Sequence, residues 1–121
     1  MARSNEFIEY LLELLQGVGE VKARAMFGGY GLYFYDVLSR ESFMFALVAD
    51  ETLYFKTDEN SRHEFEVRGL EAFTYERNGK PFSMSYNEAP GEALDDPEEM
   101  TDWANKAINA ARRSAVKKHT K

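Results

Sequence analysis

The chain has 121 residues, is 44% hydrophobic and 14% aromatic, carries a net charge of −6 and contains no cysteine. A chain of this length and hydrophobic content forms one domain with its own core, and it is not intrinsically disordered. The lack of cysteine excludes a disulfide scaffold and a thiolate metal site, and it agrees with a cytoplasmic location, which we expect. The acidic charge makes direct binding to nucleic acid unlikely, and the longest apolar run, 43–49, is too short to span a membrane.

The first predicted elements are a helix and two strands around a cluster of glycines. Apolar residues at helical spacing predict a helix over about residues 5–16. Strand-type residues follow at 21–26 and 32–35. The glycine motif stands between these two runs and reads Met26-Phe27-Gly28-Gly29-Tyr30-Gly31. Its glycines predict either a two-residue hairpin turn at Gly28-Gly29 or a bulge in one long strand.

The glycine motif does not match a phosphate-binding loop. A dinucleotide fingerprint needs three spaced glycines between a strand and a helix, but here a strand follows, and no Gly-Lys-Ser/Thr sequence is present. We therefore interpret Gly28, Gly29 and Gly31 as structural glycines. The alternative is a small ligand-binding protein or enzyme that uses the Gly28–Gly31 region with neighbouring tyrosines, and a pocket with several converging polar groups would favour it.

The apolar run 43–49 predicts a strand with two apolar faces. Alternation separates its side chains into two sets, namely Phe43, Phe45, Leu47 and Ala49 on one face and Met44, Ala46 and Val48 on the other. Helices of a two-layer domain cover only one face of its sheet. The second set is therefore covered by another part of the chain, or it forms an interface with a partner or in a homodimer, which we expect.

The remaining segments complete an α+β domain. Asp50-Glu51 predicts a turn into a strand at 52–56, and a short helix is expected over about 58–68. Asn78-Gly79 predicts a hairpin in which Phe82, Met84 and Tyr86 share a buried face. A last helix begins at Pro97, with Asp96 as its N-cap. The predicted fold is a two-layer sandwich with an antiparallel sheet and helices mainly on one face, in the order α-β-β-β-α-β-β-α.

Charged residues are unevenly distributed in the second half of the chain. No lysine or arginine occurs from 81 to 105, where Glu88, Glu92 and Asp95 form either a candidate docking surface or a solvated loop. Basic residues follow, so we expect a domain over 1–114 and a basic tail over 115–121. His63 lies at helical spacing from two glutamates, but we interpret this set as a solvated face and expect no metal, cofactor or catalytic residue.

An ordered set of segments resembles the N-terminal domain of the TfoX/Sxy competence regulators. The segments run from about residue 7 to residue 111 and are Met26–Tyr33, Phe43–Lys56, Phe73–Tyr75, Ser83–Tyr86, Ala93–Glu98 and Trp103-Ala104. The resemblance implies a fold like that of type III secretion chaperones and a link to the transcription of DNA-uptake genes. It also implies protein partners, with the cyclic-AMP receptor protein or RNA polymerase as candidates. The function expected from it is that of a non-catalytic regulatory, protein-binding domain.

Overall fold

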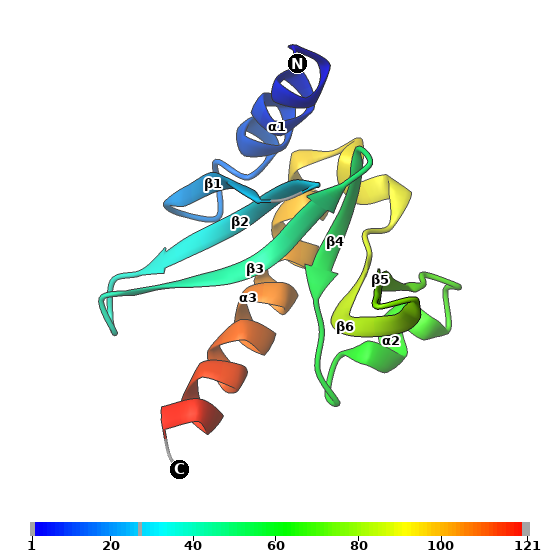
Figure 1. Cartoon of the computed structure of the whole chain (residues 1–121). Coiled ribbons are helices and arrows are strands. Elements are labelled where there is room, and N and C mark those ends of the chain that lie inside the picture. The colour runs from blue at the N-terminus through cyan, green and yellow to red at the C-terminus, as the bar shows by residue number, and fades with distance from the viewer. Residues whose placement is uncertain (1, 27, 120–121) are drawn as a thin grey trace.

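A computed structural model describes residues 2–26 and 28–119 and contains one six-stranded antiparallel sheet. The elements in chain order are α1 (Ala2–Leu14), β1 (Val21–Met26), β2 (Gly29–Asp36), β3 (Glu41–Ala49), β4 (Thr52–Lys56), α2 (Arg62–Glu66), β5 (Ala72–Arg77), β6 (Lys80–Glu88), the 3-10 helix η1 (Gly91–Leu94) and α3 (Pro97–His119). Neighbouring strands follow the order β1-β2-β3-β4-β6-β5 (Figure 1). The predicted α+β class with an antiparallel sheet is confirmed.

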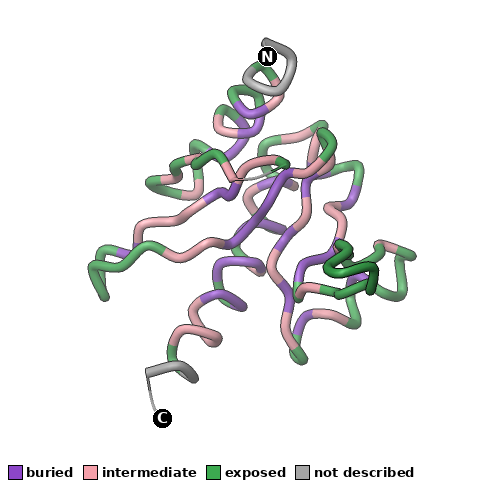
Figure 2. The backbone as a smooth tube through the Cα atoms, viewed as in Figure 1, coloured by how far each residue is buried: buried purple, intermediate pink, exposed green. Residues whose placement is uncertain are grey.

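Helices α1 and α3 pack on the same face of the sheet. In Figure 1, α3 passes behind β3 and β4, while the opposite face of these strands is turned toward the viewer. We call this second face the open face. Figure 2 shows the burial that results, with buried residues concentrated along the central strands and the inner side of α3, and exposed residues along the β5–β6 hairpin.

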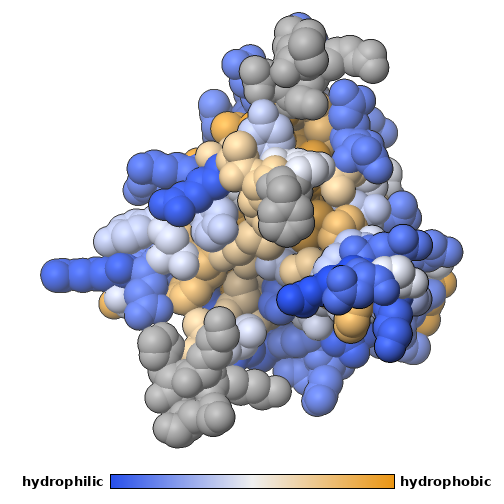
Figure 3. Space-filling model, viewed as in Figure 1, coloured by the Kyte–Doolittle hydropathy of each residue, from blue (hydrophilic) through white to orange (hydrophobic). Residues whose placement is uncertain are grey.

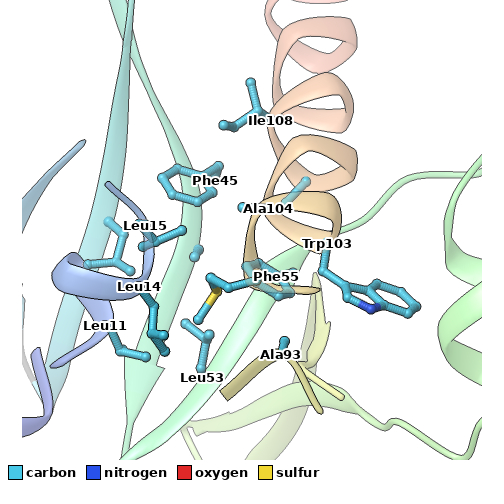
Figure 4. Close-up of a cluster of buried hydrophobic side chains, with 14 of the residues drawn as sticks. Leu11, Leu14, Leu15, Phe45, Leu53, Phe55, Ala93, Trp103, Ala104 and Ile108 are labelled. Atoms are coloured by element: carbon cyan, nitrogen blue, oxygen red, sulfur yellow. The ribbon is translucent and has the colours of Figure 1, made fainter. Parts of the chain in front are cut away.

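The core joins both long helices to the central strands. Leu11, Leu14 and Leu15 from α1 and its end meet Phe45, Leu53 and Phe55 from the sheet (Figure 4). Helix α3 contributes Met100 and Trp103, together with the alanines Ala104, Ala107 and Ala111. Because an alanine side chain is a single methyl group, the axis of α3 can approach the aromatic rings of β3 and β4 closely.

The glycine motif forms a hairpin turn, so β1 and β2 are separate strands rather than one long bulged strand. Met26 pairs with Gly29, and Gly28 has a φ of +80°. Gly29 therefore already belongs to β2, and the turn lies one residue earlier than the Gly28-Gly29 turn that the sequence predicts. Phe27 lies outside the described residues.

Two other hairpin turns lie where the sequence predicts them. Asn78 and Gly79 join β5 to β6 with φ values of 55° and 77°. Asp50 and Glu51 join β3 to β4 with φ values of 52° and 57°. Two consecutive residues with positive φ form the type I′ turn, which matches the twist of the flanking strands. Of these two turns, only the Asp50-Glu51 turn contains no glycine.

A bulge in β3 changes which of its side chains share a face. Leu32 pairs with Ala46, but Tyr33 pairs with Met44, so Phe45 is the extra residue. Phe45, Ala46 and Val48 all belong to the core cluster with the helices. The prediction that Met44, Ala46 and Val48 share one face is therefore wrong, because strict alternation does not continue through a bulge.

The helix boundaries differ from the predicted ones at several ends. Helix α1 lies two to three residues nearer the N-terminus than expected, and α2 is only five residues long. Helix α3 begins at Pro97, and the backbone N–H of Glu99 donates to the Asp96 carboxylate at 3.0 Å, which confirms the predicted cap. The helix continues to His119, beyond the expected domain boundary at 114. Among the described residues, no helix is both long and apolar enough to cross a membrane.

Asp58 connects the turn before α2 to the far end of α3. Its carboxylate accepts hydrogen bonds from the Arg113 guanidinium at 2.6 and 3.0 Å. It also accepts from the backbone N–H groups of Asn60 and Ser61. The hydrogen bonds from Arg113 are the main reason that the pKa of Asp58 lies below its ordinary value.

We expect the Asp58–Arg113 pair to make stability sensitive to acid. A carboxyl group with a lowered pKa in the folded state stabilises the protein above its unfolded pKa, and this contribution is lost as the pH falls through the folded value. Between about pH 6 and about pH 3, the free energy of unfolding should therefore fall more in the parent protein than in Asp58→Asn. Urea unfolding at several pH values measures this difference. Asp95→Asn, at an exposed carboxylate, is the control, and equal pH dependence of the parent and Asp58→Asn would contradict the expectation.

The β3–β4 turn predicts a stabilising double substitution. Non-glycine residues are disfavoured at positive φ, whereas Asn-Gly is the preferred type I′ sequence. Replacing Asp50-Glu51 by Asn-Gly should raise the free energy of unfolding by about 1 kcal/mol. The opposite change in the other turn, Gly79→Glu, should lower it by a similar amount. Thermal unfolding measures both, and a lower melting temperature for the Asn-Gly variant would contradict this reasoning.

Candidate functional site

The open face of the sheet carries an apolar groove. Its volume is about 780 Å³, and its walls come from opposite ends of the sheet. Met26 of β1 and the glycines of the β1–β2 turn lie on one side, the β5–β6 hairpin lies on the other, and Leu47 and Ala49 of β3 lie between them. Because the first and last strands in the sheet order line one groove, the sheet must curl around it. Figure 3 shows hydrophobic residues near the centre of this face.

Three of the four methionines that the structure describes lie on this face. Met26 and Met84 line the groove, and the sulfur atoms of Met26 and Met44 lie together over Gly31. A Cβ atom added to Gly31 would be 2.8 Å from each of these sulfur atoms. The missing side chain at Gly31 thus leaves room for two thioethers. Methionine is flexible and polarizable, and it is frequent on surfaces that adapt to apolar partners.

A row of aromatic rings continues from the sheet onto the β5–β6 hairpin. Tyr54 and Phe73 form an edge-on pair with ring centroids 5.1 Å apart. Phe73 stacks on Tyr75 at 6.3 Å, and Tyr75 stacks on Phe82 at 5.9 Å. The predicted buried face of Phe82, Met84 and Tyr86 is confirmed only at Tyr86, which is 6% exposed, because burial decreases along β6 toward Phe82, which is 43% exposed at the hairpin end. The alternation in β6 directs these side chains to the open face of the sheet, and not to the core between the sheet and the helices.

Tyr86 connects β6 to β3 on the open face. Its hydroxyl group donates to the carbonyl oxygen of Met44 at 3.2 Å, and Lys56 Nζ lies 5.3 Å from its ring centroid. Burial, followed by the proximity of Tyr33, raises the pKa of Tyr86 far above its ordinary value. The phenol therefore stays protonated and acts as a hydrogen-bond donor that connects β6 to β3.

Charges of opposite sign gather at opposite ends of the open face. The Arg24 guanidinium lies 5.4 Å from the Tyr33 ring, and Lys22 and Arg24 line a second hollow of about 560 Å³ together with one carboxylate, that of Glu20. Around Tyr54 the charges are negative. Burial raises the pKa of Tyr54, and Glu88, Asp50 and Glu71 raise it further. The groove itself borders the acidic end, where its lining includes Asp50 and Glu76, together with Arg77.

A smaller hollow of about 380 Å³ lies beside the glycine motif. Its lining comprises Phe7, Gly28, Gly29, Tyr30, Val48, Asp50 and Glu51. The glycines therefore border both this hollow and the groove. The groove has the mostly apolar lining typical of a surface that binds side chains, whereas the lining of the smaller hollow includes two carboxylates, those of Asp50 and Glu51.

The structure separates the candidate interface residues of the sequence analysis. Met44 lies on the open face beside Gly31, whereas Ala46 and Val48 have 0% and 5% exposure and pack in the core. Two of the three residues predicted to form a homodimer interface are therefore covered by the chain's own helices. The homodimer itself stays a prediction.

The candidate acidic surface is also divided. Glu88 is half-buried on the open face, opposite Tyr54. Glu92 accepts a hydrogen bond from the Arg68 guanidinium, which in turn lies 5.3 Å from the Trp103 ring. Asp95 is exposed after η1. His63 lies on α2, and within the part of the chain that the structure describes, no three His, Cys, Asp or Glu side chains form a group that could hold a metal ion.

Comparison with known proteins identifies a family. A family model described as the TfoX N-terminal domain matches residues 13–111, which is most of the chain. The match contains every strand of the sheet, the glycine motif and the first part of α3. No curated protein matches the chain significantly.

The glycine motif predicts different losses of stability for two matched substitutions. A Cβ atom at Gly29 would lie 1.9 Å from the backbone oxygen of Val48, so Gly29→Ala must push β2 away from β3. We expect a loss of about 3 kcal/mol in the free energy of unfolding. At Gly31 the new methyl group meets the flexible ends of two methionine side chains at 2.8 Å and the ring of Tyr33 at 3.1 Å, with no backbone atom nearer than these, so Gly31→Ala should cost only about 1 kcal/mol.

Chemical denaturation of the two variants and the parent measures this difference. Gly91→Ala provides a third comparison, because a Cβ atom there meets no other atom within 4 Å. Equal losses at Gly29 and Gly31 would contradict the assignment of Gly29 as the site of close backbone approach.

Proposed function

Because the chain belongs to the TfoX N-terminal domain family, we propose that it is a non-catalytic regulatory domain that binds proteins through the open face of its sheet. The observation that carries this proposal is the apolar groove, with its methionine and aromatic lining. Exposed apolar surface is costly in water, and contiguous patches of it mark interaction sites. The helices leave this face uncovered among the described residues.

The partner in this proposal is a component of the transcription machinery. The resemblance to competence regulators suggests the cyclic-AMP receptor protein or RNA polymerase. Protein contact fits the charge of the chain better than direct contact with DNA, because a DNA-binding domain needs a basic surface and this chain has a net charge of −6. The groove offers an apolar core with charged ends, an arrangement common in protein interfaces.

We propose binding rather than catalysis for two reasons. The groove is lined mainly by thioether, aromatic and aliphatic groups, which supply contact area and not nucleophiles. The phenol of Tyr86, the most strongly perturbed group on this face, is held protonated in a hydrogen bond to the backbone. A small ligand beside Gly28 and Gly29 is the alternative, and the hollow of about 380 Å³ with Asp50 and Glu51 is the observation in its favour.

The proposal predicts that exposed aromatic residues of the β5–β6 hairpin contribute to partner binding. Tyr75 and Phe82 are 36% and 43% exposed, so their replacement should leave the core intact. In surface plasmon resonance with purified cyclic-AMP receptor protein and RNA polymerase, Tyr75→Ala with Phe82→Ala should weaken binding at least about tenfold. Each aromatic contact in an interface contributes on the order of 1 kcal/mol or more.

Val67→Ala is the matched control, because Val67 is an exposed apolar residue beside α2 that does not line the groove. It should bind like the parent. If neither transcription protein binds the parent chain, the proposed partner is wrong. If both bind and the aromatic variant binds equally well, the open face is not the contact surface.

A further inference from the structure

The groove has the chemistry to select one kind of protein segment. We propose that it binds a basic segment of the partner that inserts a large apolar side chain between the methionines and the β5–β6 hairpin. This inference rests on the proposed protein-binding function and adds the chemical class of the bound segment. Three features of the open face carry it, namely the shape of the groove, its lining and the sign of the surrounding charge.

The shape of the groove favours a partner segment with a protruding side chain over a flat protein surface. Its walls belong to β1 and to the β5–β6 hairpin, which stand at the two edges of the sheet, and its floor is β3. A volume of about 780 Å³ accommodates one or two large side chains of an inserted segment. Two copies that meet by this same face would place one hollow against the other and leave this volume unfilled.

The lining of the groove favours an apolar side chain. Met26, Leu47, Phe73 and Met84 surround it from four different strands. The absent side chain of Gly31 allows the ends of Met26 and Met44 to lie close to the strand. Because thioether chains change rotamer at low cost, they can move apart and contact an incoming leucine or phenylalanine.

The charge around the groove favours a basic segment. Carboxylates outnumber cations at this end of the face, where Asp50 and Glu76 line the groove together with Arg77, and Glu71 and Glu88 act on nearby Tyr54. The cations Arg24 and Lys56 instead lie over the Tyr33 and Tyr86 rings at the other end. A partner segment with lysine or arginine beside its apolar anchor therefore meets complementary charge. A second copy would bring another net charge of −6.

Three short fluorescent peptides test the proposal with the full chain. They share the same leucine and phenylalanine residues, and these are separated by lysine in the first, by glutamine in the second and by glutamate in the third. Fluorescence anisotropy should show that the lysine peptide binds at least about tenfold more tightly than the glutamine peptide, and that added salt reduces this preference. The glutamate peptide should bind most weakly. Equal affinities for the lysine and glutamate peptides would overturn the inference.

Two pairs of variants separate the contributions of charge and apolar contact. Asp50→Asn with Glu76→Gln should reduce the preference for lysine over glutamine about fivefold or more, because it removes two carboxylates from the groove. Glu13→Gln with Glu98→Gln makes the same change of charge at another hollow, between α1 and α3, and should leave the preference unchanged. Tyr75→Ser with Met84→Ser should weaken the lysine and glutamine peptides alike. Circular dichroism melting shows that each variant is folded.

Two outcomes would assign the groove to another occupant or another site. If the parent sediments as a dimer that Tyr75→Ser with Met84→Ser dissociates, the groove binds a second copy and the inference is wrong. If both groove pairs bind the lysine peptide like the parent, the peptide binds elsewhere and the inference is again wrong.

The experiment also distinguishes this inference from the proposed function. Peptide selectivity without binding of either transcription protein supports the groove chemistry and contradicts the proposed partner. Binding of a transcription protein that Tyr75→Ala with Phe82→Ala weakens, together with no peptide selectivity, supports the proposed function and overturns the inference about a basic segment.

Discussion

The packing of α3 across β3 and β4 is the contact on which the rest of the structure depends. Ala104, Ala107 and Ala111 allow the helix to lie close to the sheet, where Phe45 and Phe55 are completely buried. Helix α1 packs beside α3 and closes the same side of the core (Figure 4). Since both long helices are used on one face, the other face of the sheet must be stabilised by its own side chains or by a partner.

The open face meets this requirement by curling and by covering itself with flexible and aromatic groups. Tyr86 connects β6 to the backbone of β3, and Tyr54 continues into the aromatic row of the hairpin. The methionines over Gly31 cover the sheet where no side chain projects from β2. Such a surface can remain exposed to water in the free protein. Replacing that water by an apolar group of a partner is nevertheless favourable, which is the property expected of a binding face.

The two ends of the glycine motif have different physical roles. Gly29 is required because the backbone of β3 approaches to a distance that no Cβ atom allows. Gly31 leaves space that the side chains of Met26 and Met44 use. The glycine motif therefore sets the spacing of two strands and forms the floor beside a groove, as expected of structural glycines. Its relation to function is indirect, because it shapes the surface that we propose to bind a partner.

Local chemistry in the sequence was sufficient to predict the turns at 50–51 and 78–79, the cap of α3 and the α+β class. Asn78-Gly79 and Asp96-Pro97 act within a few residues, so their effects can be predicted without the rest of the chain. The bulge at Phe45 could not be predicted in this way, because it depends on the register between β2 and β3. It places Ala46 and Val48 in the core, and only Met44 of the predicted set reaches the open face.

The groove shows more clearly which features depend on local sequence and which depend on tertiary structure. The sequence by itself determined that the 82–86 segment alternates and that the 43–49 strand is apolar throughout, because these patterns depend only on neighbouring residues. Only the tertiary structure decided that Met26 and Tyr75, from opposite edges of the sheet, line one groove. The physical reason is that the curl of a sheet arises from the twist and pairing of all its strands together, and no single segment specifies it.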